Sequence, residues 1–172
     1  MKSPQPAISS AGPRIRTFAT FPAAVQAILI NRNEEILLLS SPTRKQGWQL
    51  VSGALEAGET VSDGTLREVY EELGADVQVR PIGTVHAETF QFDENIPFML
   101  SVYTLFAYEG GKILPTDDMA GSEAHWFSLT DLDQPSLKFH ATAKPWMLKR
   151  AIDLFRLWGS DPIPPLKPFR KR

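Results

Sequence analysis

The segment from Thr60 to Gly74 constrains the fold of this chain more than any other stretch, because it combines helix signals with an unusual run of acid. Thr60 can cap the N-terminus of a helix, and Asp63 follows where a negative charge complements the helix dipole. Gly74 is a typical C-terminal stop, while Gly64 is a weak point inside the pattern. We expect a helix from Thr60 to Leu73.

Three glutamates, Glu68, Glu71 and Glu72, lie close together on this expected helix. At about 100° per residue they share a sector of roughly 100°. Val69 and Leu73 fall on the other side of the helical wheel, where they form an apolar face suited to a sheet. The pattern therefore predicts a helix that anchors through one side and presents three carboxylates on the other.

Crowded carboxylates repel one another, at roughly 0.3 kcal/mol per pair on an isolated helix. Seen alone, such a cluster is most often a solvated face. It can also bind Mg²⁺ or Mn²⁺, because hard divalent cations prefer carboxylate oxygens and share their remaining positions with substrate phosphates. A cation bound there could neutralise a diphosphate and activate a water, which is the chemistry of metal-assisted hydrolysis.

The glutamate cluster is part of a longer pattern with fixed spacing. With U for a large aliphatic residue, the pattern reads GX5EX7REUXEEXG, and the chain matches it completely from Gly53 through Glu59 and Arg67 to Gly74. A chance match to this many fixed positions is negligible. The pattern is the Nudix box, and on it the sequence resembles the Nudix hydrolases over residues 53–75.

The resemblance implies an α/β fold of the Nudix type, an α/β/α sandwich around a mixed β-sheet. It also implies a pyrophosphohydrolase that uses Mg²⁺ or Mn²⁺ to cleave the diphosphate bond of a nucleoside diphosphate linked to another moiety, or a nucleoside triphosphate. By motif position the metal-binding residues are Glu68, Glu71, Glu72 and the backbone carbonyl of Ser52. Glu71 or Glu72 also acts on the water, and the residues expected to support the site structurally are Gly53, Gly58, Glu59 and Arg67.

The entrance to the box departs from the common Pro-Gly-Gly, since the chain has Val51-Ser52-Gly53 there. Family members often add an acidic ligand or base from outside the box. Glu123 is our candidate for this catalytic role, followed by Asp117, Asp118 and Glu88.

Aromatic side chains outside the box are candidates for holding a base. Phe90 and Phe92 are the predicted substrate-binding residues, in the segment FQFDENIPF where one long expected strand ends and the loop to the next begins, and Tyr103 and Trp126 could also stack a base. Each of these rings is also a plausible core residue. His86, His125 and His140 are scattered, and no metal-ligand spacing connects them.

The remaining periodicity predicts one domain at residues 18–159, flanked by a flexible arm at 1–17 and a Pro-rich basic tail at 160–172. Apolar or alternating runs indicate strands, and a second helix is expected from Pro145 to Trp158, with Met147, Ala151, Leu154, Phe155 and Trp158 on its apolar face. That face suits core packing or a homodimer contact. The expected strands are residues 21–30, 35–41, 48–51, 77–92, 98–109 and 123–129.

Composition sets further limits. The 172 residues carry a formal net charge of −2 with a pI near 5.9, which gives no global signal for binding nucleic acid or an anionic membrane. There is no cysteine, so thiolate catalysis and cysteine-ligated zinc are excluded. No apolar run reaches membrane-spanning length, and we expect a cytoplasmic protein with a small diphosphate substrate.

Three hypotheses remain open at this level: a metal-dependent diphosphate hydrolase, a catalytically silent Nudix-fold module that binds nucleotides or regulates, and an interaction protein whose acidic helix docks a basic partner.

Overall fold

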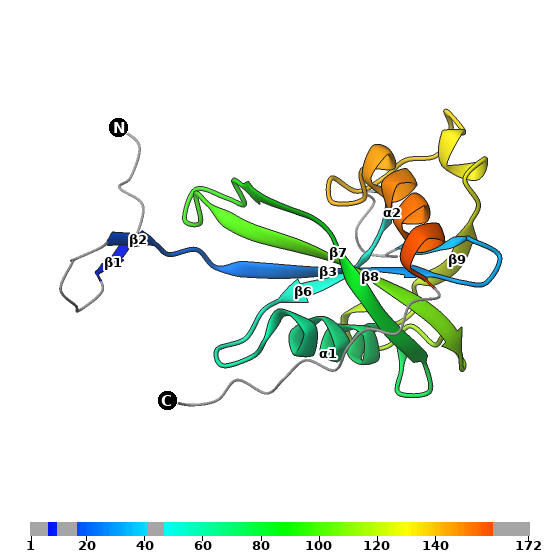
Figure 1. Cartoon of the computed structure of the whole chain (residues 1–172), viewed down its shortest axis with the longest axis horizontal. Coiled ribbons are helices and arrows are strands. Elements are labelled where there is room, and N and C mark those ends of the chain that lie inside the picture. The colour runs from blue at the N-terminus through cyan, green and yellow to red at the C-terminus, as the bar shows by residue number, and fades with distance from the viewer. Residues whose placement is uncertain (1–6, 10–16, 41–46, 160–172) are drawn as a thin grey trace.

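The computed structural model describes residues 7–9, 17–40 and 47–159. The main body of these residues is a layered α/β fold, with a curved sheet between two helices (Figure 1). The expected α/β/α sandwich around a mixed sheet is confirmed. Within the described residues, no helix is long and apolar enough to cross a membrane.

The main sheet has seven strands in the order β5-β4-β3-β8-β7, with β6 paired to β3 and β9 paired to β4. The sheet is mixed because β3 and β8 run parallel, whereas the other pairs are antiparallel. The strands are β3 (Ala23–Ile30), β4 (Ile36–Ser40), β5 (Trp48–Gln49), β6 (Val51–Ala54), β7 (Gln78–Phe90), β8 (Met99–Gly110) and β9 (Glu123–Phe127).

Each face of the sheet carries one apolar cluster covered by one helix. Helix α1 (Val61–Leu73) buries Val69 and Leu73 against the cluster that contains Leu29 and Phe106. Helix α2 (Pro145–Trp158) covers the opposite cluster, which contains Ile28 and Leu105. Alternation along each strand sends successive side chains to the two faces, so one sheet serves both cores.

The ends of α1 follow the sequence prediction. The Thr60 hydroxyl accepts a hydrogen bond from the Asp63 amide at 3.2 Å, and Gly74 ends the helix with a positive φ of 93°. The amide groups of Leu114 and Thr116 donate to carbonyls in the last turn of α1, those of Leu73 and Glu72. A distant loop therefore completes the helix end that the local sequence only begins.

The structure departs from the sequence prediction in several details. The expected strand at 48–51 is two short strands, β5 and β6, that separate at Leu50 because β5 pairs with β4 and β6 pairs with β3. Strand β1 (Ala7–Ser9), within the segment 1–17 predicted to be an arm, pairs antiparallel with β2 (Thr17–Ala19) in a small sheet apart from the main sheet (Figure 1). The expected tail at 160–172 lies outside the described residues.

Helix α2 buries a somewhat different face from the expected one. Met147 and Ala151 are buried as expected, together with Leu148 and Ile152, whereas Trp158 is 40% exposed. Trp158 lies over Gly83 of β7 rather than in the core. The helix packs on β7, β3 and β8, so the buried face serves the chain's own core.

Candidate active site

Glu68 and Glu72 lie one helical turn apart on the side of α1 that faces β6. Although they are acidic, Glu68 is only 9% exposed and Glu72 only 7%. The Ser52 amide donates to Glu72 Oε2 at 3.3 Å, so strand and helix meet through this carboxylate. The structure therefore places two box glutamates in the seam between α1 and β6.

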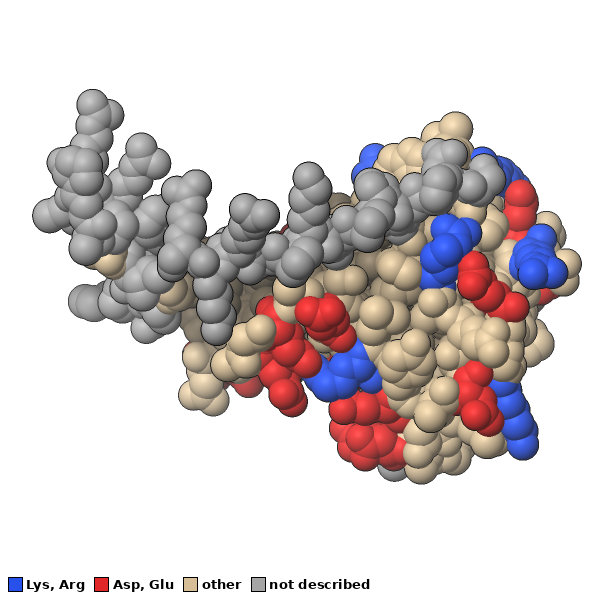
Figure 2. Space-filling model, turned by 60° about the horizontal axis from the view of Figure 1, so that its bottom comes forward, with Lys and Arg blue, Asp and Glu red and all other residues tan. Residues whose placement is uncertain are grey.

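This position corrects the expectation that all three glutamates share one solvent-facing side. Glu71 is the exposed member, with 44% of its side chain accessible, while Glu68 and Glu72 are as buried as parts of the core. The helical wheel missed the difference because β6 lies over part of the sector that the three residues share. Figure 2 shows acidic side chains gathered on the α1 side of the molecule, around basic atoms.

Gly53 makes the close approach of strand and helix possible. A Cβ added at Gly53 would lie 2.0 Å from Glu68 Oε1, far inside van der Waals contact. Gly58 serves a different purpose, since its φ of 93° provides a turn and an added Cβ would meet nothing within 4 Å. The first box glycine is therefore needed for space and the second for backbone conformation.

Arg67 ties the loop of the box to the helix. Its Nε donates to Glu59 Oε1 at 2.8 Å, and its Nη2 donates to the backbone carbonyl of Ala54 at 2.9 Å. Its Nη1 donates to Glu68 Oε1 at 2.7 Å and to Glu71 Oε2 at 2.8 Å. One planar guanidinium thus fixes the loop and neutralises two neighbouring carboxylates, which a lysine could not do with the same geometry.

The electrostatics of the site follow from burial and from this arginine. Burial raises the pKa of Glu68, against the opposing effect of the Arg67 guanidinium. The hydrogen bonds from Arg67 and from the Glu56 amide lower the pKa of Glu59. The seam therefore holds a carboxylate whose charge is poorly solvated, a condition that a bound cation would relieve.

Gly64, predicted from the sequence only as a weak point of the helix, also lets the box loop pack closely on α1. An added Cβ there would lie 2.6 Å from Leu55 Cδ1 and 2.8 Å from Glu59 Oε2. Glycine lets the box loop pack directly on the first turns of α1. A glycine inside an otherwise regular helix was the available signal, since such a residue often marks close packing.

The donor set of the seam suits a hard divalent cation. Carboxylate oxygens of Glu68 and Glu72 converge on β6 near Gly53 and Ser52, and Glu71 lies on the same helix. Across the described parts of the chain, however, no three His, Cys, Asp or Glu side chains already converge as a metal cluster. The contact of Ser52 with Glu72 uses the Ser52 amide, whereas the motif implies the Ser52 carbonyl as a metal ligand.

The candidate residues outside the box come from three other parts of the fold. Glu123 opens β9, pairs in register with Ser40 of β4, and lines a separate open cavity of about 560 Å³ with Trp48 and His125. Asp117 and Asp118 form the short η1 helix (Asp117–Met119), which contacts α1.

Glu88 lies on β7, where it forms an ion pair with Lys144 and accepts a hydrogen bond from the Tyr103 hydroxyl at 3.2 Å. Phe90 and Phe92 contact each other edge to face, with 6.4 Å between ring centroids. Strand β7 is three strands away from β6 in the sheet, about 14 Å at ~4.8 Å per strand, so neither Glu88 nor Phe90 adjoins Glu68.

The remaining aromatic and histidine candidates are divided among separate places. His86 lies between Tyr103 and Trp146, and His125 contacts Trp48 and Phe127 beside Glu123. His140 Nδ1 is 2.8 Å from Thr142 Oγ1. Trp126 contacts Tyr108 on the α1 side of the sheet.

Comparison with known proteins indicates the same protein family as the fold and the motif at residues 53–75. The family model for the NUDIX domain matches residues 20–149, which include the whole sheet and α1. The chain belongs to the Nudix family. Members of this family generally use divalent metal cations.

Similar curated proteins include the NAD-capped RNA hydrolase NudC of Pseudomonas fluorescens, 34% identical over 142 residues, which covers 80% of this chain and 47% of that protein. NudC of Pseudomonas aeruginosa is 32% identical over 142 residues, with 82% and 46% covered. The chain thus spans about half the length of these relatives.

Solved structures show the same fold. An ADP-ribose pyrophosphatase from Streptococcus suis superposes with a TM-score of 0.62 at 21% identity, covering 80% of this chain and 93% of that one. A MutT NUDIX hydrolase from Burkholderia pseudomallei gives 0.61 at 21% identity, with 76% and 98% covered.

Proposed function

We propose that the protein is a metal-dependent pyrophosphohydrolase that cleaves the diphosphate bond of a nucleoside diphosphate linked to another moiety, in the cytoplasm. The observation that carries this proposal is the pair of buried carboxylates, Glu68 and Glu72, held in the seam between α1 and β6 beside Arg67. Burying two carboxylates in this seam costs folding free energy, because each charged group loses its hydration. A binding role for divalent cations accounts for their burial.

Each side chain of the site has a proposed task. Glu68 and Glu72 hold Mg²⁺ or Mn²⁺, with the Ser52 carbonyl beside them and with Glu71 able to turn inward as a further ligand. The cation, when bound, supplies neutralisation of diphosphate charge and a lower pKa for water. Arg67 fixes the direction of the Glu68 carboxylate and holds the loop through Glu59, with Gly53 and Gly58 setting the loop backbone.

Proton removal from the attacking water is assigned to an exposed carboxylate. Glu71 is the exposed box glutamate on α1, and the hydrogen bond from Arg67 orients its carboxylate. Glu123 stays a second candidate, because it is exposed at the rim of its cavity and could serve a substrate that extends across the sheet.

The names of the curated relatives suggest the substrate to test first. NAD contains a diphosphate that joins two nucleosides, so it fits the proposed class of a nucleoside diphosphate with a second moiety. We propose NAD and NAD-like dinucleotides as candidate substrates. Phe90 and Phe92 remain proposed contacts for the far end of such a molecule.

A silent nucleotide-binding module is the second candidate function, favoured by one specific observation. Arg67 already bridges Glu68 and Glu71, so part of the acidic charge is neutralised by the protein itself. A protein that had lost catalysis could keep this arrangement.

The deciding experiment is a panel of NAD, ADP-ribose and nucleoside triphosphates with Mg²⁺ or Mn²⁺, scored for two phosphorylated products. Glu72→Gln should lower kcat by more than ~100-fold, since even residues that only support metal ligands cost 10–100-fold. Glu109→Gln is the matched control, because Glu109 is an exposed acid of β8 that pairs with Arg80. Nucleotide binding without any product, in the wild-type protein, would select the silent module.

A further inference from the structure

The face of the sheet under α2 contains polar groups that the glutamate seam does not use. Over the residues that the structure describes, four buried side-chain atoms have no hydrogen-bond partner: Gln26 Oε1, Arg80 Nη1, Ser101 Oγ and Thr104 Oγ1. Of these residues, Gln26 and Ser101 lie on the α2 face and Thr104 lies on the α1 face. Gln26 is 4% exposed and Ser101 is fully buried. An unpaired buried amide oxygen costs folding free energy, and proteins that keep one commonly have a ligand or water to satisfy it.

Gln26 and Ser101 lie on the same face of neighbouring strands. Side chains two residues apart on a strand point to the same face of the sheet. Gln26 is two residues from Ile28 on β3, and Ser101 is two residues from Tyr103 on β8, and both Ile28 and Tyr103 belong to the α2-side cluster. Register pairing then gives two adjacent rows across the sheet. One row is Ser52, Gln26, Tyr103 and His86, and the next is Ala54, Ala24, Ser101 and Glu88.

The rows begin at the proposed catalytic seam. Ser52 is the first residue of its row, and its amide donates to Glu72. From β6 the rows cross β3 and β8 to β7, a span of about 14 Å at ~4.8 Å per strand. The seam lies on the α1 side of β6 and the rows lie on the α2 side of the sheet. Because β6 pairs only with β3 among the described strands, a molecule with its diphosphate at Glu72 would pass the free edge of β6 and extend its nucleoside along these rows.

The far end of the rows is strongly polar. Glu88 pairs with Lys144, the residue that precedes α2, and also accepts the Tyr103 hydroxyl. Burial raises the pKa of Tyr103 to about 12, so its hydroxyl stays a neutral donor. Ser101 lies close enough to Tyr103 to act on that pKa, although no atom pairs with its hydroxyl in good geometry.

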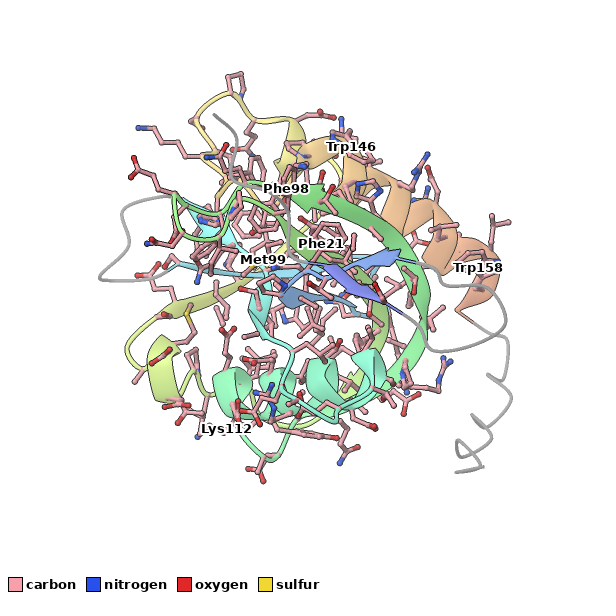
Figure 3. All side chains as sticks on the ribbon, turned by 90° about the vertical axis from the view of Figure 1, so that its left-hand side faces the viewer. Phe21, Phe98, Met99, Lys112, Trp146 and Trp158 are labelled. Atoms are coloured by element: carbon pink, nitrogen blue, oxygen red, sulfur yellow. The ribbon has the colours of Figure 1, made fainter. Side chains whose placement is uncertain are left out.

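The middle of the rows combines small and flexible side chains. Ala24 and Ala54 are small, and Met99, two residues before Ser101, has an unbranched side chain that can move aside. Figure 3 looks onto this end of the sheet, where Phe21, Phe98 and Met99 gather below the start of α2 with Trp146. Phe21 and Phe98 contact each other with 6.3 Å between centroids.

We propose that these rows bind the nucleoside of the diphosphate substrate, with Gln26 as a specificity-determining residue that accepts a hydrogen bond from an exocyclic amino group of the base. The inference rests on the proposed function, because it places the diphosphate in the glutamate seam. An unpaired acceptor selects a ligand with a donor at that point, so an amino base such as adenine is preferred over its keto counterpart. Ser101 supports the same recognition from the neighbouring strand.

The test compares NAD with nicotinamide hypoxanthine dinucleotide, in which an oxygen acceptor replaces the amino group of adenine and the neighbouring ring nitrogen N1 carries a hydrogen. The wild-type protein should favour NAD by about tenfold in kcat/KM, the value of one hydrogen bond, mainly through KM. Gln26→Leu should erase the preference and raise KM for NAD about tenfold, with kcat changed by less than ~2-fold. Ser101→Ala should raise KM in the same direction.

Thr104→Val is the matched control. Thr104 also carries a buried hydroxyl without a partner and lies on β8, but three residues from Ser101 and therefore on the α1 face. It should leave the NAD preference intact. Melting curves should show that all three variants fold, since each removes a buried oxygen that has no hydrogen-bond partner.

A binding readout keeps this inference separate from the hydrolase proposal. AMP should raise the melting temperature of the wild-type protein more than IMP does, and Gln26→Leu should remove the difference. AMP discrimination without hydrolysis would contradict the hydrolase proposal alone. Equal shifts by AMP and IMP, or a preference that survives in Gln26→Leu, would overturn the role of Gln26.

Discussion

The carboxylate of Glu68 lies directly against Gly53, so closely that a Cβ on Gly53 would stand 2.0 Å from Glu68 Oε1. Strand β6 and helix α1 therefore meet at the Glu68 carboxylate, which is a proposed metal ligand. Any side chain at this position must move either β6 or the carboxylate.

Gly53→Ala should consequently damage activity more than stability. We expect a loss of kcat/KM of at least ~100-fold, because a displacement of about 1 Å at a catalytic group can cost that much. Gly83→Ala is the control, since an added Cβ there would meet Trp158 at an ordinary 3.6 Å. Steady-state kinetics and thermal melts on both variants make the comparison. Full activity in Gly53→Ala would show that Glu68 need not occupy this position.

Arg67→Lys tests the shared guanidinium. Lysine keeps the positive charge but cannot donate at once to Glu59, Glu68 and the Ala54 carbonyl. We expect kcat/KM to fall by about 10–100-fold, the usual cost of losing support for a metal ligand. Arg156→Lys, at the surface pair with Glu34, should change little. Equal rates for the wild type and Arg67→Lys would show that only the positive charge of Arg67 matters, and not its hydrogen-bond geometry.

Glu68→Gln should raise the stability of the metal-free protein while it removes activity. Burial raises the pKa of Glu68, so the charged form is the disfavoured one in the folded state. The penalty exists above the folded pKa and disappears as the pH falls and the carboxyl takes up its proton. Urea unfolding should thus show the largest gain near neutral pH and a shrinking gain toward pH ~4. A variant less stable than the wild type at every pH would contradict this account.

Glu88→Gln should have the opposite pH dependence. Burial acts to raise the pKa of Glu88, but the hydrogen bond and charge of Lys144 outweigh it and the pKa is lowered. The pair therefore stabilises the protein above the unfolded pKa of about 4.3 and loses that effect as the pH falls through the folded value. The variant should be less stable than the wild type at pH 7 and equal to it in acid. Lys144→Met should produce the same loss, and the double variant should add nothing.

Much of the fold and the box could be predicted because local rules decide them. The Thr60 cap, the Gly74 stop and the apolar side of α1 follow from residues within one helix, and the structure has them. The burial of Glu68 and Glu72 could not be read in the same way. It depends on β6, which pairs with β3 and is brought against α1 by contacts far apart in the chain.

The position of Gln26 also could not be predicted from the sequence, because it depends on strand pairing. Gln26 is one polar residue in the apolar run of β3, and the run alone predicted a buried strand. Only the pairing of β3 with β6 and β8 shows that Gln26 lies between Ser52 and Tyr103. A single amide side chain in an otherwise apolar strand is the feature of the sequence that could have pointed to Gln26 as a binding residue.

The central claim is that the seam between α1 and β6 binds a divalent cation, and crystals soaked in Mn²⁺ test it most directly. Anomalous difference density should appear against the carboxylates of Glu68 and Glu72 and should be absent in Glu72→Gln crystals treated alike. Empty density in the wild type, with Arg67 still bridging Glu68 and Glu71, would contradict the claim.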